Sequence, residues 1–187
     1  MMKLLLASKS PRRQELIKML EIPYSVVSLG DVDEVYPPDK CPDEVAAYLS
    51  KLKASAYKNI LNEDEILVTA DTIVMIDKEI LGKPRDLEDA KRILMKLSGK
   101  VHRVITGVTL TSKEKSVTFS TITDVYFAHL SKEHIDFYVE KFKPLDKAGA
   151  YGIQEWIGAV GINRIDGSFY NVMGLPVHQL YKELQKF

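Results

Sequence analysis

An apolar, β-branched run at Ile66–Ile76 constrains the fold most, because a carboxylate interrupts it. Continuous Val, Ile and Met over this length predicts a strand that is buried on both faces. Asp71 breaks the run within Ala70-Asp71-Thr72, and a buried carboxylate is costly unless it is paired, hydrogen-bonded or bound to a metal. Two interpretations remain open. One is a strand-end carboxylate tied to a backbone turn, and the other is a general base or metal ligand at a strand terminus, where α/β sites tend to lie.

Strands and helices alternate along the chain around this run. Strands are expected at Leu4–Ala7, Tyr24–Leu29, Ile66–Ile76, Glu79–Leu81, Val101–Thr111, Ser116–Ala128 and Ile162–Ile165. Helices are expected to begin near Pro11, Pro42, Asp86, Ser131 and Pro176. The last helix is expected to turn Val177, Leu180, Tyr181 and Leu184 inward. Because two long strands are adjacent in the chain, hairpins accompany the helices, and the fold class is α/β with a mixed sheet.

Length, charge and cysteine content bound the class of protein. The 187 residues predict one domain, with room for two lobes. The 26 basic and 26 acidic side chains cancel, which disfavours nucleic acid as a main partner, because counterion release needs concentrated positive charge. The single cysteine, Cys41, excludes an internal disulfide and indicates a reducing compartment. No apolar run has the length of a membrane helix or a signal-peptide core, so we expect a cytoplasmic protein without a membrane partner.

A basic segment, Ser8-Lys9-Ser10-Pro11-Arg12-Arg13, joins the first strand to the first helix. The free N–H groups of a helix's first turn attract anions, and hydroxyls and guanidiniums add donors there. Arginines at the N-terminus of a helix are unfavourable for its dipole, so binding of an anion explains their presence better than helix stability does. The alternative is a capped helix with a solvated basic first turn.

Carboxylates at Asp31, Asp33 and Glu34 are suited to a hard divalent cation, although such a cluster is most often a solvated loop. Lys53 lies on the shoulder of its expected helix, about 80° from the apolar centre at 100° per residue. Its ammonium can reach a cleft there or extend to solvent.

Two further polar residues lie beside backbone-restricting neighbours. Gly82-Lys83-Pro84 places a cation in a stiff setting just after a strand, and the plainer interpretation is an ordinary turn. Gln154 ends the segment Gly149-Ala150-Tyr151-Gly152-Ile153-Gln154, where its amide can both donate to and accept from a base edge. A loop glutamine without a partner is the alternative.

Taken together and in order, these segments resemble the Maf family, the septum-formation-inhibitor homologues, over essentially the whole chain. The segments that carry the resemblance are Leu6–Arg13, Ala70–Thr72, Leu81–Pro84, Val104–Val108, Asp146–Gln154 and Val172–Pro176. The resemblance implies one domain over residues 1–187, an elongated α/β fold with two lobes around a central cleft, related to the inosine triphosphate pyrophosphatases. It also implies a homodimer.

The implied reaction is hydrolysis of a nucleoside triphosphate to the monophosphate and pyrophosphate with a divalent cation, Mg²⁺ or Mn²⁺. The family's proton acceptor falls on Asp71, and Glu34 and Asp71 are the expected metal ligands. Its other phosphate and catalytic positions fall on Ser8, Arg13, Lys53 and Lys83.

The family's positions for base choice fall on Arg12, Thr72 and Gln154, a combination that resembles the dTTP/UTP branch rather than the 7-methyl-GTP branch. The chain departs from the family at Asp124, where Glu is common, which leaves the role of this residue open. A nucleotide- or nucleic-acid-binding regulator of cell division is the alternative function. Such a binder needs the cations but has no use for Asp71.

Overall fold

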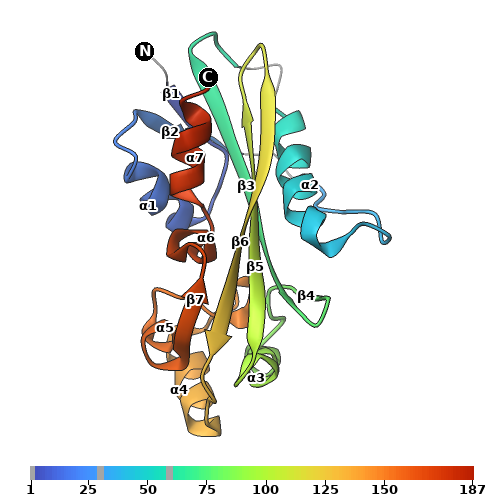
Figure 1. Cartoon of the computed structure of the whole chain (residues 1–187), viewed down its shortest axis with the longest axis vertical. Helices are drawn as coiled ribbons and strands as arrows, with labels where there is room; N and C mark the ends of the chain where they lie inside the picture. Colours follow the sequence, from blue (N-terminus) through green and yellow to red (C-terminus); the bar gives the residue numbers. More distant parts are fainter. Residues whose placement is uncertain (1–2, 29–31, 58–60) are drawn as a thin grey trace. The chain divides into compact units, whose positions relative to one another are not determined.

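The computed structural model describes residues 3–28, 32–57 and 61–187 (Figure 1). Within these residues one sheet has the strand order β2-β1-β3-β5-β6-β7, with β4 paired to β3. The strands are β1 (Lys3–Leu6), β2 (Tyr24–Val26), β3 (Glu65–Ile76), β4 (Glu79–Leu81), β5 (Val101–Thr111), β6 (Ser116–Phe127) and β7 (Ile162–Asp166). β1 runs parallel to β2 and β3, whereas β4 and β7 run antiparallel to their neighbours, which confirms the mixed α/β class.

Helices connect the strands at almost every crossover. They are α1 (Pro11–Lys18), α2 (Pro42–Ser55), α3 (Leu87–Leu97), α4 (Lys132–Phe142), the 3₁₀ turn η2 (Ala148–Ala150), α5 (Trp156–Gly161), α6 (Phe169–Met173) and α7 (Val177–Leu184). Asp86 caps α3 by accepting from the Asp89 N–H at 2.7 Å, and Ser131 caps α4 by accepting from the His134 N–H at 3.2 Å. Both caps follow the expectation from sequence, because a short polar side chain satisfies an orphan N–H there.

The chain divides into two compact units, which are described separately. Unit 1 comprises Met1–Thr72, Thr106–Thr121 and Gly174–Phe187, and unit 2 comprises Ile73–Ile105 and Ile122–Met173. The single elongated domain with two lobes around a cleft stays a prediction.

In unit 1, β1 is an apolar strand that lies between its parallel neighbours β2 and β3. Leu4, Leu5 and Leu6 are buried, and Leu6 pairs with Val68 of β3. The Ala7 N–H continues the ladder by donating to the Val68 carbonyl at 3.0 Å. The carboxyl end of β1 therefore lies beside Val68, in the middle of β3, and the residues that follow along the two segments include Ser8 and Asp71, both expected site residues.

Gly107 brings the backbone of α2 directly against β5. A Cβ built at Gly107 would lie 2.3 Å from the carbonyl carbon of Ala46 and 2.3 Å from the Ala47 nitrogen. No side chain fits between backbones this close, so glycine is required here for packing rather than for backbone freedom.

Gly107→Ala is therefore expected to destabilise the chain by about 1–3 kcal/mol, because α2 must move away from β5. Chemical denaturation measures the loss. Gly82→Ala is the matched control, because a Cβ at Gly82 would meet nothing within 4 Å. Equal stability of the two variants would contradict the tight packing of α2.

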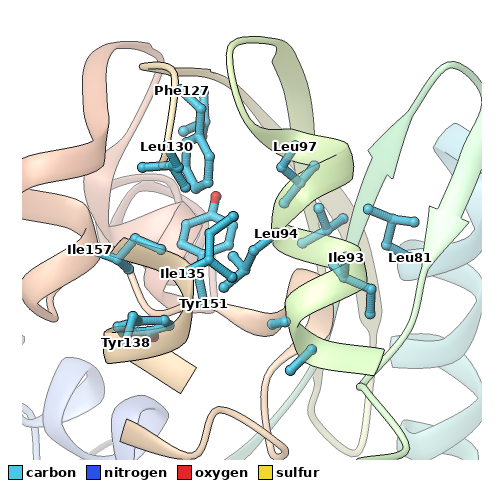
Figure 2. Packing of buried hydrophobic residues seen from close by; sticks show 14 of the residues in the cluster. Leu81, Ile93, Leu94, Leu97, Phe127, Leu130, Ile135, Tyr138, Tyr151 and Ile157 are labelled. Atoms are coloured by element: carbon cyan, nitrogen blue, oxygen red, sulfur yellow. The ribbon is translucent and has the colours of Figure 1, made fainter. Parts of the chain in front are cut away.

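The core of unit 2 is built by α3, α4 and the segment around η2. Its cluster of buried side chains includes Leu81, Ile93, Leu94, Leu97, Phe127, Leu130, Ile135, Tyr138, Tyr151 and Ile157 (Figure 2). His102 is buried beside them, and its Nε2 lies 2.7 Å from the Tyr151 hydroxyl oxygen. Burial lowers the pKa of His102 to about 4, so the ring is neutral at pH 7.

Four local expectations differ from the structure. β3 continues through Asp71 without interruption, because a carboxylate can keep extended backbone when its charge is paired. Tyr181 is 47% exposed rather than inward, since the buried face of α7 consists of Val177, Leu180, Glu183 and Leu184. β2 ends at Val26, and Leu29 lies outside the described residues. α5 and α6 are not among the helices expected from the sequence.

Candidate active site

The candidate site in unit 1 is built around the ammonium of Lys53. Lys53 Nζ lies 2.7 Å from Asp71 Oδ1 and 3.0 Å from Glu34 Oε1. The Lys53 and Asp71 side chains are only 10% and 12% exposed, whereas Glu34 is 55% exposed. Asp71 is therefore paired with a side chain rather than tied to a backbone turn. Lys53 points inward rather than to solvent.

Buried hydroxyl groups hold α2 in the position from which Lys53 reaches Asp71. Thr69 Oγ1 donates to the Ser50 carbonyl at 2.7 Å, and the Ser50 hydroxyl lies 2.9 Å from that of Thr109. Ser50 precedes Lys53 by one helical turn, and Thr69 lies on the same face of β3 as Asp71. The hydroxyl network thus ties α2, which carries Lys53, to β3, which carries Asp71.

Arg13 reaches from α1 to two other parts of unit 1. Its Nε donates to the Gly174 carbonyl at 2.8 Å, and its Nη2 donates to Thr72 Oγ1 at 3.0 Å. The Thr72 hydroxyl is also 2.9 Å from that of Thr106. Burial lowers the pKa of Arg13, while the charge of Asp71 acts in the opposite direction. These two bonds use two of the five N–H donors of a guanidinium, so the side chain can hold its position and still bind an anion.

The start of α1 has the geometry of an anion site without a side-chain cap. Ser8 is buried just after β1, and its hydroxyl accepts from the Ser10 N–H at 3.2 Å. Ser10 occupies the N-cap position but makes no side-chain capping bond among the described residues. Arg12 is half-buried in the first turn. The alternative interpretation, a helix capped by a side chain, therefore lacks, in the described part of the chain, the capping hydrogen bond that it requires. The role of these residues in phosphate binding stays a prediction.

Lys83 and Gln154 belong to unit 2, and both side chains are exposed. Lys83 follows β4, and the carbonyl of its neighbour Gly82 accepts from the Gly149 N–H at 3.2 Å. The loop that carries Lys83 is thereby joined to the segment that ends at Gln154. Their convergence with Asp71 on one substrate stays a prediction.

Asp124 also lies in unit 2, where its Oδ1 accepts from Arg103 Nε at 3.1 Å. Both side chains are about one-third exposed, so this is a partly screened ion pair. The contact gives Asp124 a structural partner.

Two groups that hold Arg13 and Thr72 in place were not predicted from the sequence, the Thr106 hydroxyl and the Gly174 carbonyl. Thr106 lies in Val104–Val108 and Gly174 in Val172–Pro176, two of the segments that carry the family resemblance. Both act through Arg13 and Thr72, and Gly174 is 161 residues from Arg13 along the chain. In the sequence, the signal for these two residues was that each lies in a segment that carries the family resemblance.

The sequence predicts Glu34 and Asp71 as the donors for a divalent cation, and this role stays a prediction. No group of three or more His, Cys, Asp or Glu side chains that could hold a metal occurs among the described residues; Asp33 is exposed, and Asp31 lies outside them. The Glu34 and Asp71 carboxylates nevertheless face one cationic group, the Lys53 ammonium. Mg²⁺ is commonly held by one or two carboxylates together with substrate phosphates, so this donor set fits such an ion.

Within the described residues, no helix is both long and apolar enough to span a membrane.

Comparison with known proteins agrees with this fold and identifies the family of the chain. The model of the family described as Maf-like protein matches residues 3–187, and the chain belongs to this family. A dTTP/UTP pyrophosphatase of Phocaeicola vulgatus is 52% identical over 184 residues, which cover 98% of this chain and 95% of that protein. A dTTP/UTP pyrophosphatase of Porphyromonas gingivalis is 50% identical over 187 residues, 99% of this chain and 94% of that protein.

Among solved structures, a HAM1 protein from Coxiella burnetii superposes with a TM-score of 0.52 at 14% sequence identity, and the match covers 100% of both chains. At this identity the likeness concerns the fold alone.

Proposed function

We propose that this chain hydrolyses dTTP and UTP to the monophosphate and pyrophosphate with the help of a divalent cation. The observation that carries the proposal is the buried Asp71–Lys53 pair, with Glu34 on the same ammonium. A protein that only binds nucleotides gains nothing from a buried carboxylate close to phosphates. Relatives that are half identical over nearly the whole chain, and are named dTTP/UTP pyrophosphatases, support the same reaction.

The reaction requires water to attack the α-phosphorus while the bond from that phosphorus to the bridging oxygen breaks. The electron pair of this bond leaves with pyrophosphate, and the attacking water gives up a proton. Lys53 holds Asp71 through Oδ1, which orients Oδ2 as the acceptor of that proton.

The phosphates of the substrate need cationic and N–H donors. Arg13, Ser8 and the first turn of α1 would bind them from unit 1, and Lys83 would bind them from unit 2. A divalent cation held by Glu34 and Asp71 would neutralise phosphate oxygens and favour ionisation of water.

The test is release of pyrophosphate from dTTP and UTP by the purified chain, with Mg²⁺ or Mn²⁺ and with a chelator. We expect one pyrophosphate per monophosphate and loss of turnover in the chelator. Binding of the nucleotide without pyrophosphate would favour the regulator instead. The homodimer and the cytoplasmic location stay predictions.

Base choice gives a second expected result. Uracil and thymine present O2, N3–H and O4, and a glutamine amide at residue 154 can accept from N3–H and donate to a carbonyl. Arg12 can only donate, which suits a carbonyl and penalises the amine of cytosine. Thr72 would place the base relative to Asp71. We therefore expect UTP and dTTP to be hydrolysed well and purine triphosphates poorly, because mismatched polar groups stay unpaired at about 1–3 kcal/mol each.

A panel of the common triphosphates at equal concentration, with wild type and Gln154→Glu, measures this preference. An ionised glutamate cannot donate, so the variant should lose UTP and dTTP turnover selectively. Gln185→Glu, at an exposed position just after α7, is the control. Equal hydrolysis of GTP and UTP by the wild type would contradict the assignment of Gln154 to the base.

A further inference from the structure

The segment that carries Gln154 is a tight turn, and a tyrosine hydroxyl from α4 binds it at both ends. The Glu155 N–H donates to the Gly152 carbonyl at 3.0 Å, which closes the turn and makes Gln154 its third residue. The three residues before Gln154 are buried, whereas Gln154 is exposed. The turn therefore presents one amide outward from an otherwise buried segment.

Both ends of this turn are bound by one hydroxyl group from another helix. Tyr138, on α4, accepts from the Gly152 N–H at 3.0 Å and donates its proton to Glu155 Oε2. A phenol has a single proton to donate and lone pairs with which to accept, so the two bonds use complementary parts of the same group. Tyr138 itself is completely buried in the unit 2 core (Figure 2).

Charge reinforces the same turn. Lys147 Nζ lies 3.2 Å from Glu155 Oε1, so each oxygen of the Glu155 carboxylate has its own partner. The Lys147 and Glu155 side chains are 10% and 19% exposed, which limits screening of the pair. Burial raises the pKa of Tyr138 and the hydrogen bond to Glu155 raises it further, so the phenol keeps the proton that it donates.

Glycine at 152 leaves room for this arrangement. A Cβ built there would lie 2.9 Å from the Glu155 carboxyl carbon and 3.1 Å from Gln154 Nε2. Any larger residue would push on both the clamped carboxylate and the amide.

We infer that Tyr138 is a positioning residue for base selection, because its hydroxyl closes the Gly152–Glu155 turn and so fixes where the Gln154 amide is presented. The inference rests on the proposed function, in which Gln154 contacts the pyrimidine. Tyr138 acts through the turn and does not itself touch the nucleotide.

Tyr138→Phe removes the hydroxyl and keeps the ring, including its stacking on Phe142 at 5.0 Å between centroids. We expect the ratio of kcat/KM for UTP to kcat/KM for GTP to fall about tenfold, which corresponds to the loss of one well-placed polar contact. The kcat for UTP should change less than about threefold, because Asp71 and the phosphate-binding residues are untouched. Tyr170→Phe, at an exposed position in the same unit, is the control and should leave the ratio unchanged.

Two further variants separate positioning from simple loss of stability. In a Gln154→Ala background, Tyr138→Phe should change the UTP/GTP ratio no further, since its effect passes through the amide. Gly152→Ala should lower the ratio without altering the core residue, which keeps the test available if Tyr138→Phe fails to fold.

The outcomes are distinct. A wild-type ratio retained in both Tyr138→Phe and Gly152→Ala overturns the inference, and so does an undiminished effect of Tyr138→Phe in the Gln154→Ala background. A wild-type chain that releases no pyrophosphate from any triphosphate overturns the proposed function and the inference with it.

Discussion

Asp71→Asn is expected to lower the turnover of UTP and dTTP by about 10²–10⁴-fold, the usual contribution of a general base. The chain should stay folded, because the amide oxygen can still accept from Lys53 and Glu34 still balances the Lys53 charge. Pyrophosphate release measures turnover, and thermal unfolding checks the fold.

Asp64→Asn is the matched control, since it makes the same change at an exposed position just before β3. It should retain wild-type turnover. If Asp71→Asn keeps turnover within a few-fold of wild type, Asp71 does not accept the proton of the attacking water.

Lys53→Met should have the largest effect on stability. The variant leaves the Asp71 carboxylate buried without its counter-charge, and breaking a buried pair from one side typically costs about 3–5 kcal/mol. Methionine has nearly the length of lysine, so packing changes little and the loss reports charge. Chemical denaturation measures it, and turnover should be lost as well.

The double variant Lys53→Met with Asp71→Asn should recover most of that stability without recovering activity, since no uncompensated carboxylate remains. Lys51→Met, exposed on the same helix, is the control and should unfold like wild type. A double variant no more stable than Lys53→Met would show that Asp71 is not the source of the cost.

Sequence patterns predicted the parts of the fold that depend on neighbouring residues. The buried strand around Asp71, the caps Asp86 and Ser131, and the two long strands β5 and β6 all have local signatures, and the structure confirms them. The prediction that Tyr181 points inward was wrong. A phenol at the edge of an apolar helix face is amphipathic, so the spacing of apolar residues does not decide whether it lies in the core or at the surface.

The contacts within the site could not be predicted in the same way. Lys53 meets Asp71 only because α2 crosses β5 at Gly107 and is held by Ser50, and periodicity carries no information about that crossing. The pairing of Arg13 with Gly174 likewise depends on where the last segments of the chain return. Burial of a carboxylate can be predicted from its apolar neighbours, but the partner that neutralises it cannot.

The support of the Gly152–Glu155 turn from α4 matters for protein engineering. Grafting the Gly149–Gln154 segment into a related scaffold transfers the amide without the hydroxyl that holds it in place. Under the proposed role of Gln154, a chimaera with altered base preference needs the donor's α4 as well. A combinatorial library should then vary Tyr138, Lys147 and Glu155 together with Gln154 rather than one position at a time.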